Sequence, residues 1–202
     1  MTKHRTLTYF IAVTLDGFIA GPEGDDPTGP GGFWPLTDDY IQYLTEEYPE
    51  TLPAAGREAL GVTAPGTRFD TVLEGRRSYE IGLKAGVADA YPHLRHLVFS
   101  TTLESVPDLA VELVREDPLE RVRALKNETG SGIWLVGGGS LAFTLRSEID
   151  ELIVKLSPVT IGKGMPLWGV EAIFDLETWV RTDVAPLPGG TTVLRFERAE
   201  VV

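Results

Sequence analysis

The chain has 202 residues, of which 43% are hydrophobic, no cysteine, and a formal net charge of −12. The negative charge argues against a broad nucleic-acid surface, because neutralising phosphates requires clustered lysine and arginine side chains. The lack of cysteine excludes disulfides, a thiol nucleophile and a cysteine metal site. No stretch approaches the roughly 20 apolar residues of a membrane span, and the first residues lack the pattern of a signal peptide. We therefore expect a cytoplasmic protein with a single domain over residues 1–202 that binds neither membrane nor nucleic acid.

The first part of the chain predicts a strand, a long loop and a helix. The apolar run Thr6–Val13 is typical of a buried strand, and Leu15–Gly17 forms a turn in which Asp16 is the turn former. Glycine and proline fill the segment Gly21–Gly32, which predicts an exposed loop. A helix is expected from Thr37, because a hydroxyl N-cap and two early carboxylates suit the helix dipole.

The rest of the chain alternates strands with short helices. The predicted strands cover Phe69–Gly75, His96–Ser100, Leu109–Val114, Ile133–Val136 and Asp150–Val159. Helices are predicted to begin at Arg76, Pro118 and Ser140, and a closing hairpin is predicted from Thr178–Leu187 and Thr191–Ala199. This order predicts an α/β fold with a central, mostly parallel sheet, helices on both faces and an antiparallel C-terminal hairpin. In such sheets, ligands bind beyond the carboxyl ends of the strands.

Three consecutive glycines follow the apolar strand Ile133–Val136. Gly137, Gly138 and Gly139 precede a helix, whose N-terminus leaves backbone N–H groups unpaired and carries partial positive charge. Without side chains, this turn would let a phosphate or pyrophosphate approach the backbone. The spacing matches neither the GxGxxG dinucleotide motif nor the Walker loop. The alternative is a tight strand-to-helix turn whose glycines serve packing alone.

A second strand-to-helix turn carries Gly75, Arg76, Arg77 and Ser78. Two guanidinium groups and a hydroxyl at the start of a helix form an anion site, because guanidinium binds phosphate oxygens bidentately. The alternative is that both arginines are solvated and pair with nearby glutamates.

A third polar strand end carries Ser100 and Thr101. Their hydroxyls could bind a ribose or its phosphate, and the alternative is that they cap a turn. All three motifs follow strands of one presumed sheet. An extended ligand with several phosphates would therefore contact them together.

The order of the motifs along nearly the whole chain resembles the dihydrofolate reductase superfamily. The stretches that carry the resemblance are FIAVTLDGFIAG, LEGRRSYE, VFSTTL, IWLVGGGSL and DELIVKLSPVTIGKGMPLW. The resemblance is strongest to the reductase (C-terminal) domain of the bacterial riboflavin-biosynthesis deaminase/reductase and its stand-alone relatives. It implies a dihydrofolate reductase-like three-layer fold and an NADPH-dependent reductase.

The resemblance also implies which residues hold the cofactor. In that family the Gly-Arg-x-Ser/Thr motif holds the phosphates, and the Ser-Thr strand end lies beside the adenosine 2′-phosphate. The triple-glycine turn contacts the pyrophosphate and nicotinamide, and the first strand with its neighbour lines the nicotinamide pocket. The corresponding residues here are Ala12, Ile19, Ala20, Gly75, Arg76, Arg77, Ser78, Ser100, Thr101, Gly137, Gly138, Gly139, Ser140 and Leu141.

On the substrate side the candidate catalytic residue is Asp39. Dihydrofolate reductases carry an acid on the helix after the first loop, where it binds the pterin ring, and Asp39 takes that position if Trp34 is the anchor. A carboxylate in a partly apolar cleft can hold a protonated heterocycle by paired hydrogen bonds. The proton for the reduction would come from a nearby acid, Asp39, or from an ordered water. Alternatively, Asp38 and Asp39 only stabilise the helix N-terminus. The long Gly21–Gly32 loop, whose action as a lid is left open, and the segment TIGKGMPLWG differ from dihydrofolate reductases.

The resemblance implies reduction of a small heterocycle. The substrate would be a ribosylaminopyrimidine, as in 5-amino-6-(5-phosphoribosylamino)uracil reductases of riboflavin biosynthesis, or a pterin, with hydride passing from nicotinamide C4. Two alternatives stay open: a true dihydrofolate reductase, and an NADP-binding protein without catalytic activity. Relatives in this family often pair, which implies a homodimer. We expect no metal, because His4, His93 and His96 lack metal-ligand spacing.

Overall fold

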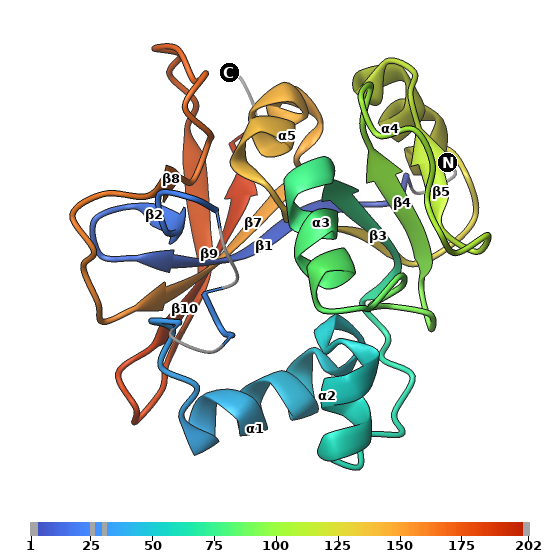
Figure 1. Ribbon diagram of the computed structural model, residues 1–202. Helices are drawn as coiled ribbons and strands as arrows, with labels where there is room; N and C mark the ends of the chain where they lie inside the picture. The colour runs from blue at the N-terminus through green and yellow to red at the C-terminus, as the bar shows by residue number, and fades with distance from the viewer. Residues whose placement is uncertain (1–3, 25–26, 30–31, 200–202) are drawn as a thin grey trace.

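A computed structural model of the chain describes residues 4–24, 27–29 and 32–199, so parts of the Gly21–Gly32 loop lie outside the described residues. Its main feature is an eight-stranded sheet in the order β5-β4-β3-β6-β1-β7-β10-β9 (Figure 1). β2 (Phe18–Ala20) and β8 (Met165–Pro166) form a separate antiparallel pair. The strands of the large sheet are β1 (Leu7–Thr14), β3 (Phe69–Gly75), β4 (Arg95–Phe99), β5 (Glu112–Val114), β6 (Gly132–Gly137), β7 (Glu151–Ser157), β9 (Trp179–Pro186) and β10 (Thr192–Arg198).

The helices are short and lie between the strands. They are α1 (Asp38–Glu47), α2 (Ala54–Ala59), α3 (Arg76–Lys84), α4 (Pro118–Lys126) and α5 (Gly139–Thr144), with 3-10 turns η1 (Pro49–Thr51) and η2 (Arg146–Glu148). At the start of α4, the Asp117 carboxylate accepts hydrogen bonds from the N–H groups of Leu119 and Glu120, and Pro118 occupies the first turn, where an N–H would have no partner. Within the described ranges, no helix is long and apolar enough to cross a bilayer.

The pairing of the strands confirms the predicted fold class. Strands β1 and β3 to β7 pair in parallel, while β10 pairs antiparallel with both β7 and β9. β3 covers the predicted range, but β5 begins at Glu112, later than predicted, because Asp108 forms a turn and accepts a hydrogen bond from the Ala110 N–H at 2.9 Å. The segment after β7 contains the short strand β8.

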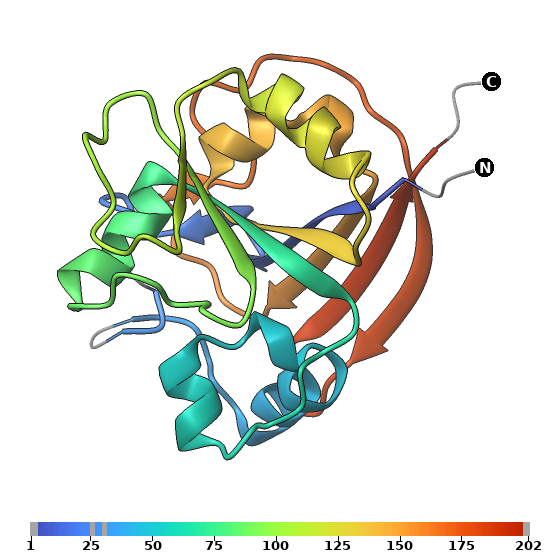
Figure 2. The ribbon, with the colours of Figure 1, turned by 90° about the vertical axis from the view of Figure 1, so that its right-hand side faces the viewer.

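Helices cover both faces of the sheet, as Figure 2 shows, with α4 and α5 on one side and α1 and α2 on the other. On the first side, Val122 of α4 and Leu141 of α5 pack with Leu135 of β6. On the α1 side, Tyr40 packs with Phe10 of β1. Burying a side chain of this size contributes about 1.5–3 kcal/mol, so both layers stabilise the sheet and fix the strand ends that form the site.

A buried polar network lies next to α3. His96 on β4 has a side chain 1% exposed, and its ring nitrogens lie 3.1 Å from Glu74 Oε2 and 2.8 Å from Asp89 Oδ1. Burial by itself lowers the pKa of His96, but the hydrogen bonds and charges of the two carboxylates outweigh burial and raise the pKa above its ordinary value. Glu74 also accepts a hydrogen bond from Ser78 Oγ at 3.2 Å, so the network connects the core to the start of α3.

We expect His96→Asn to lower the free energy of unfolding by about 3 kcal/mol near pH 6, because it leaves two buried carboxylates without their cationic partner. Since the folded pKa is raised, the stabilisation by charged histidine is complete below the ordinary pKa and is lost as pH rises through the folded pKa. Urea unfolding of both proteins from about pH 5 to 9 should therefore give a difference that narrows with rising pH. The exposed His4 supplies the matched control His4→Asn, and a difference independent of pH would contradict the assignment.

Candidate functional site

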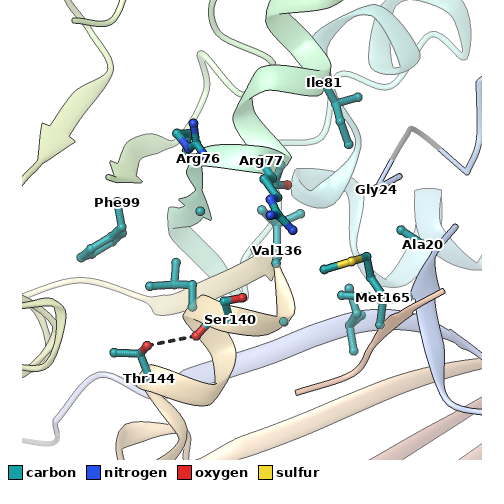
Figure 3. Close-up of a pocket in the computed structure, with 18 of the residues that line it drawn as sticks. Ala20, Gly24, Arg76, Arg77, Ile81, Phe99, Val136, Ser140, Thr144 and Met165 are labelled. Carbon is teal, nitrogen blue, oxygen red and sulfur yellow. Dashed lines mark hydrogen bonds between the residues drawn. The ribbon is translucent and has the colours of Figure 1, made fainter. Parts of the chain in front are cut away.

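A cavity of about 600 Å³ lies at the carboxyl ends of the parallel strands (Figure 3). A space of this size is typical of small-molecule sites. Every residue that the sequence predicted at a cofactor lines this cavity. These residues are Ala12, Ile19, Ala20, Gly75, Arg76, Arg77, Ser78, Ser100, Thr101, Gly137, Gly138, Gly139, Ser140 and Leu141.

The glycines of the triple-glycine turn at the end of β6 have different surroundings. A Cβ atom on Gly139 would lie 2.4 Å from the backbone nitrogen of Gly169, so glycine lets the turn pack against the segment after β8. A Cβ atom on Gly138 would meet no atom within 4 Å, and this residue lines the cavity. A Cβ atom on Gly75, at the end of β3, would lie 3.4 Å from the Gly138 nitrogen, so the two turns touch. The packing interpretation therefore holds for Gly139, while Gly138 leaves open space at the cavity.

The start of α3 brings positive charge to the cavity. Arg76 lies on the side of Phe99, and Arg77 lies nearer Val136 (Figure 3). The Arg76 guanidinium lies 3.6 Å from Glu80 Oε1, one helical turn further on. A partly exposed ion pair of this kind contributes little stability, whereas a bidentate contact with a phosphate is stronger. The arrangement therefore suits an anionic ligand.

The hydroxyls at the end of β4 both cap a turn and line the cavity. Ser100 Oγ accepts hydrogen bonds from the backbone N–H groups of Thr102 and Leu103, at 3.2 and 2.9 Å. Ser100, Thr101 and Thr102 also line the cavity. The cap thus fixes the backbone that carries Thr101.

The start of α5 is tied to the segment after β8. Ser140 Oγ donates a hydrogen bond to Glu171 Oε2 at 2.8 Å. The Thr144 hydroxyl donates to the Ser140 carbonyl at 3.0 Å, as Figure 3 shows. The Ser140 hydrogen bond, and more weakly the charge of Arg77, lower the pKa of the Glu171 carboxyl. The Ser140 hydroxyl is therefore already engaged at the cavity wall.

Sequence reasoning missed the side chains that line the cavity from the α1 side of the sheet. Phe10 and Ala12 on β1, Trp134 and Val136 on β6, and Lys155 on β7 form what we call the α1-side wall. Of these, only Ala12 was predicted at the site. The others alternate along their strands with residues that face α4 and α5. In the sequence they therefore look like ordinary residues of buried strands. The sequence signal for this wall is Lys155, a charged residue inside the mostly buried strand β7.

Asp39 is not among the residues that line the cavity, and its catalytic role stays a prediction. Asp39 Oδ2 accepts a hydrogen bond from the backbone N–H of Gly189, in the turn between β9 and β10, at 2.8 Å. That hydrogen bond, followed by one from Thr37, lowers the pKa of the Asp39 carboxyl. Trp34, the residue used to anchor the prediction, does line the cavity. The Asp39 carboxylate therefore joins α1 to the C-terminal hairpin.

The sheet order, the covering helices and the cavity at the strand ends define a protein with the dihydrofolate reductase-like fold. A putative riboflavin biosynthesis protein from Shewanella sp. PV-4 shares it, with a TM-score of 0.65 and 21% identity over 96% of this chain and 99% of that one. A Thermotoga maritima diaminohydroxyphosphoribosylaminopyrimidine deaminase/5-amino-6-(5-phosphoribosylamino)uracil reductase gives a TM-score of 0.64 and 16% identity over 98% of this chain and 57% of that one.

Two relatives from Bacillus subtilis (strain 168) are similar in sequence. The chain is 30% identical over 179 residues to the uncharacterized protein YyaP, in an alignment that covers 82% of this chain and 81% of YyaP. It is 30% identical over 166 residues to the uncharacterized protein YwjB, over 81% of this chain and 83% of that one. The chain therefore belongs to the family of YyaP and YwjB. No family model matches the chain.

The different surroundings of the glycines give a test of the turn. Gly139→Ala should lower the free energy of unfolding by about 1–3 kcal/mol, because its Cβ would overlap backbone atoms. Gly138→Ala, the matched variant one residue earlier, should keep wild-type stability, because its Cβ enters open space at the cavity. Thermal unfolding of the two variants measures the difference. Equal destabilisation by both would show that packing alone explains the glycines.

The position of Asp39 gives a second test. We expect Asp39→Asn to leave ligand binding and turnover at the wild-type level, because the carboxylate contacts the Gly189 N–H outside the cavity. An amide oxygen can still accept this hydrogen bond. Ligand titration and steady-state assay of the variant check this expectation, and a large fall in turnover with unchanged cofactor affinity would restore Asp39 as the catalytic acid.

Proposed function

We propose that the protein is an NADPH-dependent reductase of a small heterocyclic substrate and that the cavity binds the cofactor. The observation that carries the proposal is the meeting of the three strand-end motifs with the first strand and its neighbour at one cavity. The family resemblance assigns these motifs to NADPH. A 5-amino-6-(5-phosphoribosylamino)uracil reductase with the same fold supports the reaction class.

The residues at the wall fit a dinucleotide with several phosphates. Arg76 and Arg77 offer bidentate donors to phosphate oxygens, and they begin the nine-residue helix α3, whose first turn favours negative charge. The space at Gly138 allows close approach of a ligand to the backbone. Ser100 and Thr101 would lie near the adenosine 2′-phosphate, the group that distinguishes NADPH from NADH.

When bound, NADPH supplies a hydride from nicotinamide C4. The contribution of the protein is to orient the two reactants and to exclude water from the space between them. Ala12, Ile19 and Ala20 form an apolar surface on β1 and β2 for the nicotinamide end, and Trp34 and Trp134 add aromatic surface. These side chains hold flat rings without competing for the hydride.

The substrate end favours a ribosylaminopyrimidine over dihydrofolate. In dihydrofolate reductases an acid on the first helix binds the pterin ring, whereas here Asp39 bonds to Gly189. The ionisable residue of the α1-side wall is Lys155. An amine at this place donates hydrogen bonds, which suits a heterocycle that presents acceptors rather than a protonated ring.

Tryptophan fluorescence tests the cofactor proposal directly, because Trp34 and Trp134 line the cavity. We expect NADPH to quench this fluorescence at low micromolar concentration and NADH to bind more weakly. NADPH oxidation is then followed with 5-amino-6-(5-phosphoribosylamino)uracil and, separately, with dihydrofolate. Binding without oxidation would favour an NADP-binding protein without catalytic activity, and a lack of NADPH binding would refute the proposal.

The two arginines are expected to differ in cofactor selectivity. Arg76→Ala should weaken the binding of NADPH by about 10- to 100-fold and that of NADH much less. The reason is that Arg76 lies on the side of Phe99, where β4 leads to the proposed 2′-phosphate site. Arg77→Ala should weaken both cofactors alike, since Arg77 lies nearer the glycine turn. The exposed Arg181 on β9, outside the cavity lining, gives the matched control Arg181→Ala. If Arg76→Ala lost equal affinity for NADPH and NADH, Arg76 would not contact the 2′-phosphate.

We also propose that the protein forms a homodimer through the outer strand of its sheet. β9 is the last strand in the order and exposes Val180 and Val184. The segment before it exposes Ile173 and Phe174. Apolar side chains beside a terminal strand favour association with a second copy of the chain.

A further inference from the structure

Lys155 is the ionisable member of the α1-side wall. It lies on β7, in register with Ala12 of β1 and Val193 of β10. Residues opposite each other on neighbouring strands point to the same face, so Lys155 lies beside Ala12, at the proposed nicotinamide end of the cavity. Its Nζ lies 3.8 Å from the centroid of the Phe10 ring. The amine is therefore placed where a substrate stacked on the nicotinamide would meet the protein.

Within the described residues, no carboxylate forms an ion pair with Lys155. Ala12 and Val193, the residues opposite Lys155 on the neighbouring strands, are uncharged. The Phe10 ring that Lys155 contacts stacks on the Tyr48 ring, with centroids 4.5 Å apart. The nearby Arg195 of β10 is engaged by Glu151 at 3.3 Å and by the Tyr48 hydroxyl at 2.6 Å. The titratable groups in the cluster around this part of β7 include Tyr40, Tyr43, Tyr48 and Tyr91. Arg195, paired with Glu151, also feels the charge of Asp183 on β9.

The Phe10 ring below Nζ favours the charged ammonium, whereas burial of Lys155 favours the neutral amine. Burial lowers the pKa of Lys155 to about 7, and neighbouring charges do not contribute. An ammonium group without an acidic partner lowers the stability of the folded chain, and a methionine would fill the same space. Because this lysine costs stability and contacts the cavity, a role in the chemistry explains its presence better than packing does.

We propose that Lys155 is the catalytic proton donor of the reductase, an inference that rests on the proposed function. In the step, the C=N or C=O acceptor of the substrate gains a hydride at carbon from the reduced nicotinamide and a proton at nitrogen or oxygen from Lys155 Nζ. An N–H bond of the ammonium breaks, and the acceptor becomes CH–NH or CH–OH. NADPH is oxidised to NADP⁺, and the Lys155 amine regains its proton from water.

Two features of the site support this role. A general acid works best when its pKa lies near the operating pH, and that of Lys155 is about 7. Lys155 is also the ionisable side chain of the α1-side wall, since Phe10, Ala12, Trp134 and Val136 carry no acid or base. The substrate would therefore turn its acceptor atom toward β7.

The first experiment compares Lys155→Met and Lys155→Arg with the wild type. Both should bind NADPH normally in the fluorescence titration and lose about 100- to 10,000-fold in kcat. Arginine keeps the positive charge but does not release its proton, so it separates proton donation from charge. Wild-type kcat should fall about tenfold per pH unit above an apparent pKa near 7, and the residual activity of the variants should lack this fall. The exposed Lys163 supplies the control Lys163→Met.

The second experiment needs no turnover and no NADPH. The Lys155 amine is titrated by NMR of the lysine side-chain nitrogens, with its signal assigned by its loss in Lys155→Arg, and should titrate near pH 7. Since the folded pKa is lowered from 10.5, the unfolded chain holds more protons between about pH 7 and 10.5, and wild-type stability rises with pH there. Lys155→Met should therefore unfold several degrees above the wild type at pH 6, with the difference closing above about pH 10.

The outcomes separate the two proposals. If NADPH does not bind to the wild type, the reductase itself is refuted, whatever Lys155 does. If NADPH binds and Lys155→Met keeps the wild-type kcat and pH profile, Lys155 is a packing residue and only this inference is overturned. A Lys155 pKa near 10.5 would also overturn it, because the amine would then hold its proton at neutral pH.

Discussion

The site depends on one constraint, the parallel pairing of β3 with β6 on one side and β4 on the other. This register places Glu74 opposite Gly137 and Gly75 opposite Phe99. Because parallel strands end at the same edge of a sheet, their three following turns meet there. The turns approach so closely that a Cβ atom on Gly75 would lie 3.4 Å from the nitrogen of Gly138. A slip of one residue in any of these strands would turn its side chains to the opposite face and separate the motifs.

The cavity continues the aromatic core on the α1 side of the sheet. Phe10 stacks on Tyr48 and meets Trp134 edge-on at 6.3 Å between centroids, and Phe10 and Trp134 also line the cavity. The polar atom of Trp134 is satisfied within this core, because its Nε1–H donates to the Phe10 carbonyl at 3.3 Å. The continuity explains why the α1-side wall is mostly apolar. It also explains why a lysine on that wall has a lowered pKa, since burial disfavours its charged form.

The α3 end of the cavity has a different support. Ser78, in the first turn of α3, donates to Glu74, which also contacts the buried His96. These groups hydrogen-bond to one another inside the core, so the start of α3 is held by side chains that do not compete for a ligand at the surface. Arg76 and Arg77 project from this anchored turn. One end of the cavity is thus cationic and hydrogen-bonded, and the other is aromatic with a single amine, which matches a ligand with phosphates at one end and flat rings at the other.

The sequence by itself determined the alternation of strands and helices and the residues at the strand ends, because apolar periodicity, caps and glycines act within a few neighbouring residues. Asp117 before α4 and the glycines after β6 are such local signals. The hydrogen-bond partner of Asp39 was decided only by the tertiary structure, since Gly189 lies 150 residues away in the sequence. The same holds for Lys155: its place in β7 is visible in the sequence, but the face it occupies and the burial that lowers its pKa arise from strands and helices packed around it. Local patterns fix where the backbone turns, whereas contacts between distant segments decide which side chains reach the cavity and in which charge state.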